Sequence, residues 1–485
     1  MANDPSLLSF TAVAVVDKLK AGEVTPHDLL DTLKARIAVV DGAVNALPIL
    51  CFERARAAAD ALMRQPKEAR GLLAGLPVPI KDLTEVGGVR TTYGSPIFAD
   101  FVPDESDILV ETLEREGALV YAKSNTPEFG AGANTFNEVF GRTLNPYNTT
   151  RSAAGSSGGA AAALATGMAW LAQGSDLGGS LRNPASFCGI VGLRPSPGRV
   201  ATNPHFDIDR RLPVEGLMAR TVEDVALLLD AMSGDDPRDP VSLPKPATPF
   251  LAAARSGWKP RRVAFSADLG ITPVDREVAD ICRKAAYRLG EAGIVVEEAH
   301  PDLSETHDTF DVLRARLFAV ARKNLLDEHR DKLKPEVIWN IERGLRLTMA
   351  DLVRAEHQRA VMLKRALAFF DTYDLLLTPA TIVPPFPVEQ RYVAELNGKK
   401  FGNYVEWLGI AYAITLIGSP ALSLPAGFTA EALPVGLQVV APPRREDRVL
   451  AGAKLLETIL DLETWRPIEP RGVSARDLDR LRRSA

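Results

Sequence analysis

Cysteine is scarce in this sequence of 485 residues, and its three copies stand far apart. Cys51, Cys188 and Cys282 form no CxxC pair, so the spacing predicts neither a disulfide framework nor a thiolate metal site, and it favours a reducing compartment. The six histidines form no HExxH motif and no Cys/His cluster. We therefore expect no metal and no other cofactor.

The sequence also lacks a basic excess and a long apolar run. Its net charge of −5 does not indicate nucleic-acid binding. The longest mostly apolar run, near residues 158–172, is shorter than the ~18 residues of a membrane span, and the first residues do not resemble a signal peptide. We expect a cytoplasmic protein with a small-molecule substrate, with neither nucleic acid nor membrane as partner, and a homodimer is the expected assembly.

Helical and strand patterns alternate along the chain. The patterns predict helices in 6–65, 105–117, 221–234, 275–293, 309–370 and 446–460, and strands in 117–125, 261–270, 373–381, 420–427 and 433–442. This alternation predicts an α/β fold: one α/β/α layered domain over 1–485, with a mixed, mostly parallel sheet surrounded by helices. The expected core covers about 66–265 and 371–465, and a mainly helical region at about 270–370 shapes a pocket.

Two glycine-rich stretches carry serines in positions suited to chemistry. In "RSAAGSSGGAAAALATG" (151–167), Ser156 and Ser157 precede a helix-forming run, so they cap a helix or sit at its positive end. In "GSDLGGS" (174–180), two glycines before Ser180 permit a tight turn that aims several N–H groups at one point. Each stretch also has a purely structural interpretation, as a capped helix or a tight turn.

A serine nucleophile needs a base, and no histidine lies in these glycine-rich stretches. A Ser-His-Asp triad stays open, because its parts meet only in the folded chain. Lysine is the other common base, and it acts only when neutral. Lys81 follows the apolar "LPVPI", a setting that can bury an amine, although Asp82 beside it would neutralise a charged lysine and most lysines are solvated.

These segments together resemble the amidase signature family. The stretch from Gly155 to Leu193 follows the family's Gly/Ser signature, and "GLPVPIKDL", "AKSNTPEFG", "FGRTLNPYN", "YDLLLTPA" and "GSPALSLPAG" resemble further family segments. The resemblance covers about 6–465. One departure is that the signature is commonly preceded by Pro-Gly, where this chain has Ala153 and Ala154, so the shape of the pocket is expected to differ there.

The resemblance implies a role for each of these residues. Ser180 is the acylated nucleophile, Ser156 the bridging serine with a cis backbone, and Lys81 the base. The implied oxyanion hole consists of the backbone N–H groups of Leu177, Gly178, Gly179 and Ser180. The residues expected to support the loop are Ser157, Asp176 and Arg182.

The implied function is serine amidohydrolysis of an aryl or aliphatic amide, with a carbamate as a further possible substrate, through an acyl-enzyme. One alternative is the glutaminase component of a tRNA-dependent amidotransferase, and another is an inactive interaction protein. The second is disfavoured because Lys81, Ser156 and Ser180 are all present. The expected substrate-pocket residues are Phe129, Ala154, Gly155, Phe187 and Trp407, with Phe140 and Tyr412 as further candidates.

Overall fold

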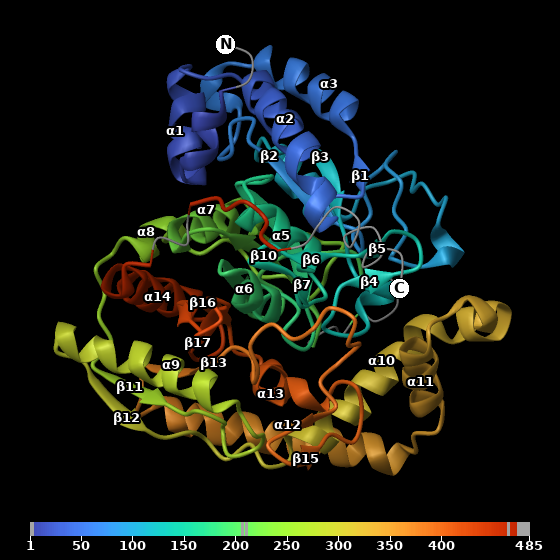
Figure 1. Cartoon of the computed structure of the whole chain (residues 1–485), viewed down its shortest axis with the longest axis vertical. Helices are drawn as coiled ribbons and strands as arrows, with labels where there is room; N and C mark the ends of the chain where they lie inside the picture. The colour runs from blue at the N-terminus through green and yellow to red at the C-terminus, as the bar shows by residue number, and fades with distance from the viewer. Residues whose placement is uncertain (1–3, 205–207, 209–211, 463–465, 473–485) are drawn as a thin grey trace.

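An eight-stranded mixed sheet runs through the molecule, with helices on both sides (Figure 1). The structure is a computed structural model and describes residues 4–204, 208, 212–462 and 466–472. In spatial order the strands are β12 (Val295–Glu298), β11 (Arg262–Phe265), β13 (Leu375–Pro379), β17 (Pro434–Val440), β16 (Ala421–Phe428), β9 (Val191–Arg194), β10 (Val214–Ala219) and β8 (Leu171–Asp176). The predicted α/β class with a mixed sheet is therefore confirmed.

The prediction of a mostly parallel sheet is wrong. Only β12–β11 and β11–β13 pair in parallel, and the other neighbouring pairs are antiparallel. One reason is that β10, which the sequence did not reveal, lies between β8 and β9 and runs opposite to both. The other is that β16 and β17 form a hairpin.

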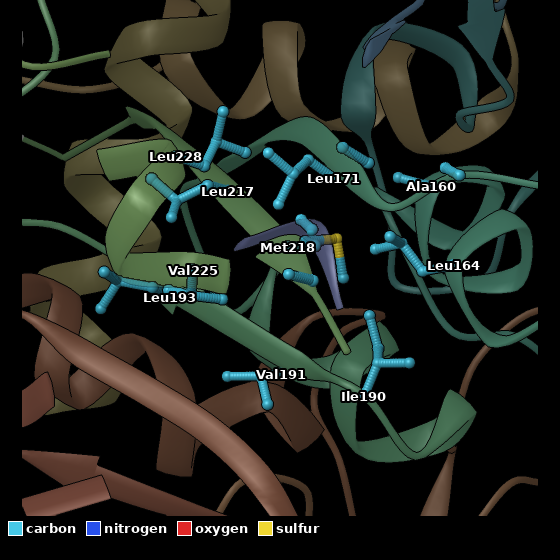
Figure 2. Close-up of a cluster of buried hydrophobic side chains, with 14 of the residues drawn as sticks. Ala160, Leu164, Leu171, Ile190, Val191, Leu193, Leu217, Met218, Val225 and Leu228 are labelled. Carbon is cyan, nitrogen blue, oxygen red and sulfur yellow. The ribbon is translucent and has the colours of Figure 1, made fainter. Parts of the chain in front are cut away.

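Small side chains and close packing hold the centre of this sheet to its helices. Helix α5 (Gly158–Ala165) is buried along its whole length, and α7 (Val222–Met232) begins at a Thr221 cap, as predicted. Figure 2 shows Leu164 of α5, Leu171 of β8 and Met218 of β10 within one apolar cluster. This cluster fixes the end of β8 and the start of α5, from which the serine loops emerge.

A smaller sheet carries the lysine segment. Its order is β1 (Ile49–Leu50), β3 (Leu119–Ser124) and β2 (Pro77–Lys81), with β2 and β3 parallel. The predicted helical region 6–65 consists of α1 (Ala12–Ala21), α2 (Pro26–Val44) and α3 (Phe52–Met63), interrupted by β1. Thr25 caps α2 in a reciprocal arrangement with Asp28.

Long helices dominate the region that the sequence assigned to pocket building. Its helices are α9 (Arg276–Tyr287), α10 (Thr306–His329), α11 (Pro335–Leu345) and α12 (Met349–Phe370). Helices α10 to α12 lie at the opposite end of the molecule from α1 to α3 (Figure 1). Strand β12 is the exception to the helical prediction, because it extends the main sheet at its edge.

The remaining helices and strands complete the fold. The other helices are α4 (Ile108–Arg115), α6 (Arg182–Cys188), α8 (Phe250–Ala254), α13 (Gly409–Leu416) and α14 (Glu446–Leu460). The other strands are β4 (Phe136–Asn137), β5 (Gly141–Arg142), β6 (Leu144–Asn145), β7 (Asn148–Ser152), β14 (Glu395–Leu396) and β15 (Lys399–Lys400). Among the described residues, no helix combines the length and apolar character that crossing a bilayer requires.

Candidate active site

Lys81 ends strand β2 and is completely buried. Its Nζ lies 2.7 Å from Ser156 Oγ, 2.8 Å from Ser157 Oγ and 3.1 Å from Ser175 Oγ. Its backbone N–H donates to Gln173 Oε1 at 2.8 Å, which ties the end of β2 to β8. The amine is thus fixed among three hydroxyl groups.

This environment favours the neutral amine. Burial lowers the pKa of Lys81 to about 7, while the carboxylates of Glu215 and Asp176 act in the opposite direction. The contact with Ser157, at the N-cap of α5, also places the amine at the positive end of that helix. A large fraction of Lys81 is therefore uncharged near neutral pH.

Asp82 does not neutralise Lys81, although it is the next residue. Its Oδ1 lies 3.3 Å from Nζ of Lys123 on β3, and its carboxylate accepts hydrogen bonds from the N–H and hydroxyl of Thr92. Asp82 lies just after the end of β2, in a turn in which the Thr84 N–H donates to the Lys81 carbonyl at 3.0 Å. In this turn the Asp82 carboxylate faces Lys123, while the Lys81 amine faces the serines.

Ser156 and Ser157 lie at the start of α5, as predicted. The Gly155–Ser156 peptide is cis, which confirms the expected backbone at Ser156. Ser157 occupies the N-cap position, but its side chain makes no capping hydrogen bond. Its Oγ contacts Lys81 instead, so the interpretation of this serine as a simple cap is wrong.

The loop after β8 is held by Asp176. Its carboxylate pairs with Arg182 at 2.8 Å and lies 3.4 Å from Arg194, and all three side chains are buried. Burial alone raises the pKa of Asp176, but the two guanidinium groups and the N–H of Gly179 hold it well below its ordinary value. The predicted pairing of Asp176 with Arg182 is present, and Arg194 adds a partner that the sequence did not reveal.

The backbone of this loop presents Ser180. Ser180 is half-buried, and its carbonyl accepts a hydrogen bond of 3.1 Å from the N–H of Ser157, so the two serine loops are in direct contact. Gly179 has φ +104°, and its N–H donates to Asp176 Oδ1 at 3.0 Å. Gly179 is therefore a correction to the predicted oxyanion donors, because its N–H is already bound to a carboxylate.

Gly178 packs closely against an aromatic ring. A Cβ on Gly178 would lie 3.3 Å from the ring of Phe310, which stacks on Tyr412 at 4.0 Å between ring centroids. A side chain at Gly178 would therefore require a small shift of this ring or of the loop. The loop of residues 177–180 therefore packs against Phe310 of α10, in the mainly helical region.

A cavity of about 410 Å³ reaches this loop at Leu177. Five aromatic side chains line it: Tyr93, Phe98, Phe101, Phe129 and Phe318. The ring of Phe129 is 6.1 Å from that of Phe98 in an edge contact, and the Arg322 guanidinium lies 4.7 Å from its centroid. Carboxylates of Glu85, Asp107 and Glu215 also line the wall.

Phe129 is the one predicted pocket residue that lines this cavity. Phe187 and Trp407 are instead fully buried in an apolar core, where each packs against Phe386. Phe140 lies under Arg90, outside the cavity lining, and the ring of Tyr412 supports the loop from behind. These corrections have a common reason: large aromatic side chains fill cores as readily as they line pockets.

The segment before Ser156 is enclosed as well. Ala153 and Ala154 are fully buried, and the Ala154 carbonyl accepts a hydrogen bond from Thr135. A Cβ on Gly155 would lie 3.1 Å from the N atom of Asn134. Neither Ala154 nor Gly155 lines the cavity, so the departure at Ala153 and Ala154 does not reshape its wall.

Three polar contacts of the site were missed. Ser175 lies within "GSDLGGS", but nothing in the sequence distinguishes it from its neighbours. Gln173 and Glu215 lie on adjacent strands, and Gln173 Nε2 donates to Glu215 Oε2 at 2.6 Å. Only the pairing of β8 with β10 brings these residues together, and β10 was itself missed.

A family model and related protein sequences match this chain over most of its length. A family model described as Amidase matches residues 28–450. An acylamidase of Rhodococcus erythropolis is 35% identical over 457 residues, 93% of this chain and 95% of the relative. The A subunit of the glutamyl-tRNA(Gln) amidotransferase of Alkaliphilus metalliredigens is 32% identical over 474 residues, 91% of this chain and 94% of the relative.

Solved structures are similar over nearly the whole chain. A bacterial aryl acylamidase of the amidase signature enzymes superimposes with a TM-score of 0.86 at 27% identity, covering 95% of this chain and 99% of that one. A 6-aminohexanoate cyclic dimer hydrolase complexed with substrate gives a TM-score of 0.86 at 27% identity, covering 96% and 100%.

Proposed function

Because the chain belongs to the amidase family, we propose that it is a serine amidase in which Ser180 attacks the substrate carbonyl and Lys81 is the base. The observation that carries this proposal is the buried amine of Lys81, 2.7 Å from Ser156 Oγ. Burial lowers the pKa of this amine to about 7, so the base is available at neutral pH.

The proton moves in two steps from nucleophile to base. Neutral Lys81 takes the hydroxyl proton of Ser156, and Ser156 takes that of Ser180. Ser180 Oγ then forms a bond to the amide carbon, and the carbonyl electrons move to oxygen. When the C–N bond breaks, the proton returns through Ser156 to the leaving amine. Water hydrolyses the Ser180 ester by the same relay in reverse.

The loop of residues 177–180 stabilises the tetrahedral intermediate. The backbone N–H groups of Leu177, Gly178 and Ser180 are the proposed oxyanion donors, while Gly179 binds Asp176 and keeps the turn in shape. The ion pairs of Asp176 with Arg182 and Arg194 hold this backbone rigid. Such donors contribute most when fixed before the charge develops.

The aromatic cavity favours an aryl-substituted amide as substrate. Its volume of about 410 Å³ lies in the range of small-molecule sites. The rings of Phe98 and Phe129 offer edge and face contacts that an arene satisfies better than an alkyl chain does. An aryl carbamate presents a similar carbonyl and ring, and it is a second proposed substrate.

Glutaminase activity is the alternative, because glutamyl-tRNA(Gln) amidotransferase chains are among the similar proteins. Glutamine carries a polar side chain and no ring, whereas five aromatic residues line the cavity. Glutamine in this cavity would make none of the ring contacts that an aryl group makes with these side chains. The cavity therefore favours the free-standing amidase.

A panel of p-nitroacetanilide, a fatty amide, glutamine and an aryl carbamate tests this function. We expect the highest kcat/KM with the anilide or the aryl carbamate and the lowest with glutamine. Ser180→Ala is expected to lower kcat by about 10⁶-fold, as removal of a serine nucleophile does elsewhere. Near-normal turnover by Ser180→Ala would refute the mechanism, and glutamine-dependent ammonia release above all other activities would favour the alternative.

A further inference from the structure

Glu215 joins the substrate cavity to the base. It lies on β10 opposite Ser175 of β8, the residue whose hydroxyl is 3.1 Å from Lys81 Nζ. Its half-buried side chain lines the cavity. No step of the proposed mechanism uses this carboxylate.

Gln173 connects Glu215 to the backbone of Lys81. Its Nε2 donates to Glu215 Oε2 at 2.6 Å and to Thr84 Oγ1 at 3.2 Å, and its Oε1 accepts the Lys81 N–H at 2.8 Å. Gln173 is fully buried, so its amide has no water to replace these partners. The carboxylate thereby orients the amide that holds the end of β2.

We propose that Glu215 is a positioning residue for Lys81: through Gln173 it fixes the end of β2, and with it the place of the amine among the serine hydroxyls. The proposal rests on the function proposed above. Glu215 then links the substrate cavity, which it lines, to the catalytic base, which it contacts through Gln173.

The charges around Lys81 support this role. Glu215 of β10 and Asp176 of β8 are the carboxylates that raise the pKa of Lys81 against the effect of burial. Asp176 is bound by Arg182 and Arg194, and its charge is engaged in holding the loop. Helix α5 presents only the hydroxyls of Ser156 and Ser157 to the amine.

The other nearby charges are compensated or lie on the cavity wall. Lys123 of β3 pairs with Asp82. Around Glu215 itself, the cavity wall carries Glu85, Asp107 and Arg322. Glu85 accepts a hydrogen bond from Tyr93 and is not among the charges that act on Lys81. Glu85 therefore provides a matched control for loss of a cavity carboxylate.

The test is the pH dependence of kcat/KM for p-nitroacetanilide in wild type, Glu215→Gln, Glu215→Asp and Glu85→Gln. Removing the negative charge of Glu215 favours the neutral amine of Lys81, so Glu215→Gln should move the midpoint down by about one pH unit. Glu215→Asp should restore most of the wild-type midpoint, and Glu85→Gln should leave the midpoint in place even if KM changes.

An unchanged or higher midpoint in Glu215→Gln would overturn the proposal, as would an equal downward shift in Glu85→Gln. If Glu215→Gln does not fold, Glu215→Met, which also removes the charge, replaces it. Its midpoint should likewise lie below that of wild type, and an unchanged or higher midpoint would refute the role. Ser180→Ala, assayed in parallel, separates the two proposals, because its activity would refute the function itself.

Discussion

Two buried lysines on adjacent parallel strands differ in one respect, the partner of the amine. Lys81 ends β2 and Lys123 lies on β3, and both side chains are fully buried. Lys123 faces the Asp82 carboxylate and donates to the Thr91 hydroxyl and the Thr84 carbonyl. Within the described part of the chain, the hydrogen-bond partners of the Lys81 amine are hydroxyl groups.

This difference separates a structural lysine from a chemical one. Burial lowers the pKa of Lys123 as well, but there the Asp82 carboxylate opposes the effect at 3.3 Å. Asp82, the residue after Lys81, thus pairs with Lys123 and is not among the carboxylates that raise the pKa of Lys81.

Replacing the chemical lysine should have the largest effect on activity. Lys81→Met removes the base and leaves no unpaired charge, so we expect kcat to fall by about 10⁴- to 10⁶-fold. The free energy of unfolding, measured by urea denaturation, should change little. Retention of activity within tenfold would contradict the assignment of Lys81.

Replacing the structural lysine should have the opposite profile. Lys123→Met leaves the Asp82 carboxylate buried and unpaired, which should reduce the free energy of unfolding by about 3–5 kcal/mol. The same urea titration measures the loss. A variant as stable as wild type would show that the ion pair does not hold these strands.

The double variant gives the smallest expected effect and isolates the pair. Lys123→Met with Asp82→Asn removes both charges together, so most of the stability lost in Lys123→Met should return. If the double variant is no more stable than Lys123→Met alone, the lost free energy of unfolding comes from packing rather than from the unpaired charge.

The sequence predicted which residues form the candidate site better than it predicted how they contact one another. The burial of Lys81 after an apolar run, the helix after Ser157 and the tight turn at Ser180 each follow from local composition. The Lys81–Ser156 contact joins residues 75 positions apart, so local patterns indicate the groups but not their meeting. The resemblance to a family supplied that link.

Other features depend on which way a side chain points. The pairing of Asp82 with Lys123 rather than Lys81 depends on the turn that follows β2 and on the strand that neighbours β2. Strand β10 was missed because "LPVEGLMAR" breaks the apolar alternation with Glu215 and Gly216. The cavity rings of Tyr93, Phe98 and Phe101 come from a segment without regular periodicity, so no pattern marked them.

The central claim is that neutral Lys81 activates Ser180, and the pH dependence of covalent modification of Ser180 tests it most directly. Phenylmethylsulfonyl fluoride reacts with an activated serine, and peptide mass spectrometry identifies the modified residue. Since burial lowers the pKa of Lys81 to about 7, the rate should rise tenfold per pH unit below that value and level off above it. In Lys81→Met the modification of Ser180 should be almost abolished. A rate independent of pH, an adduct on another residue, or equal rates in wild type and Lys81→Met would contradict the account.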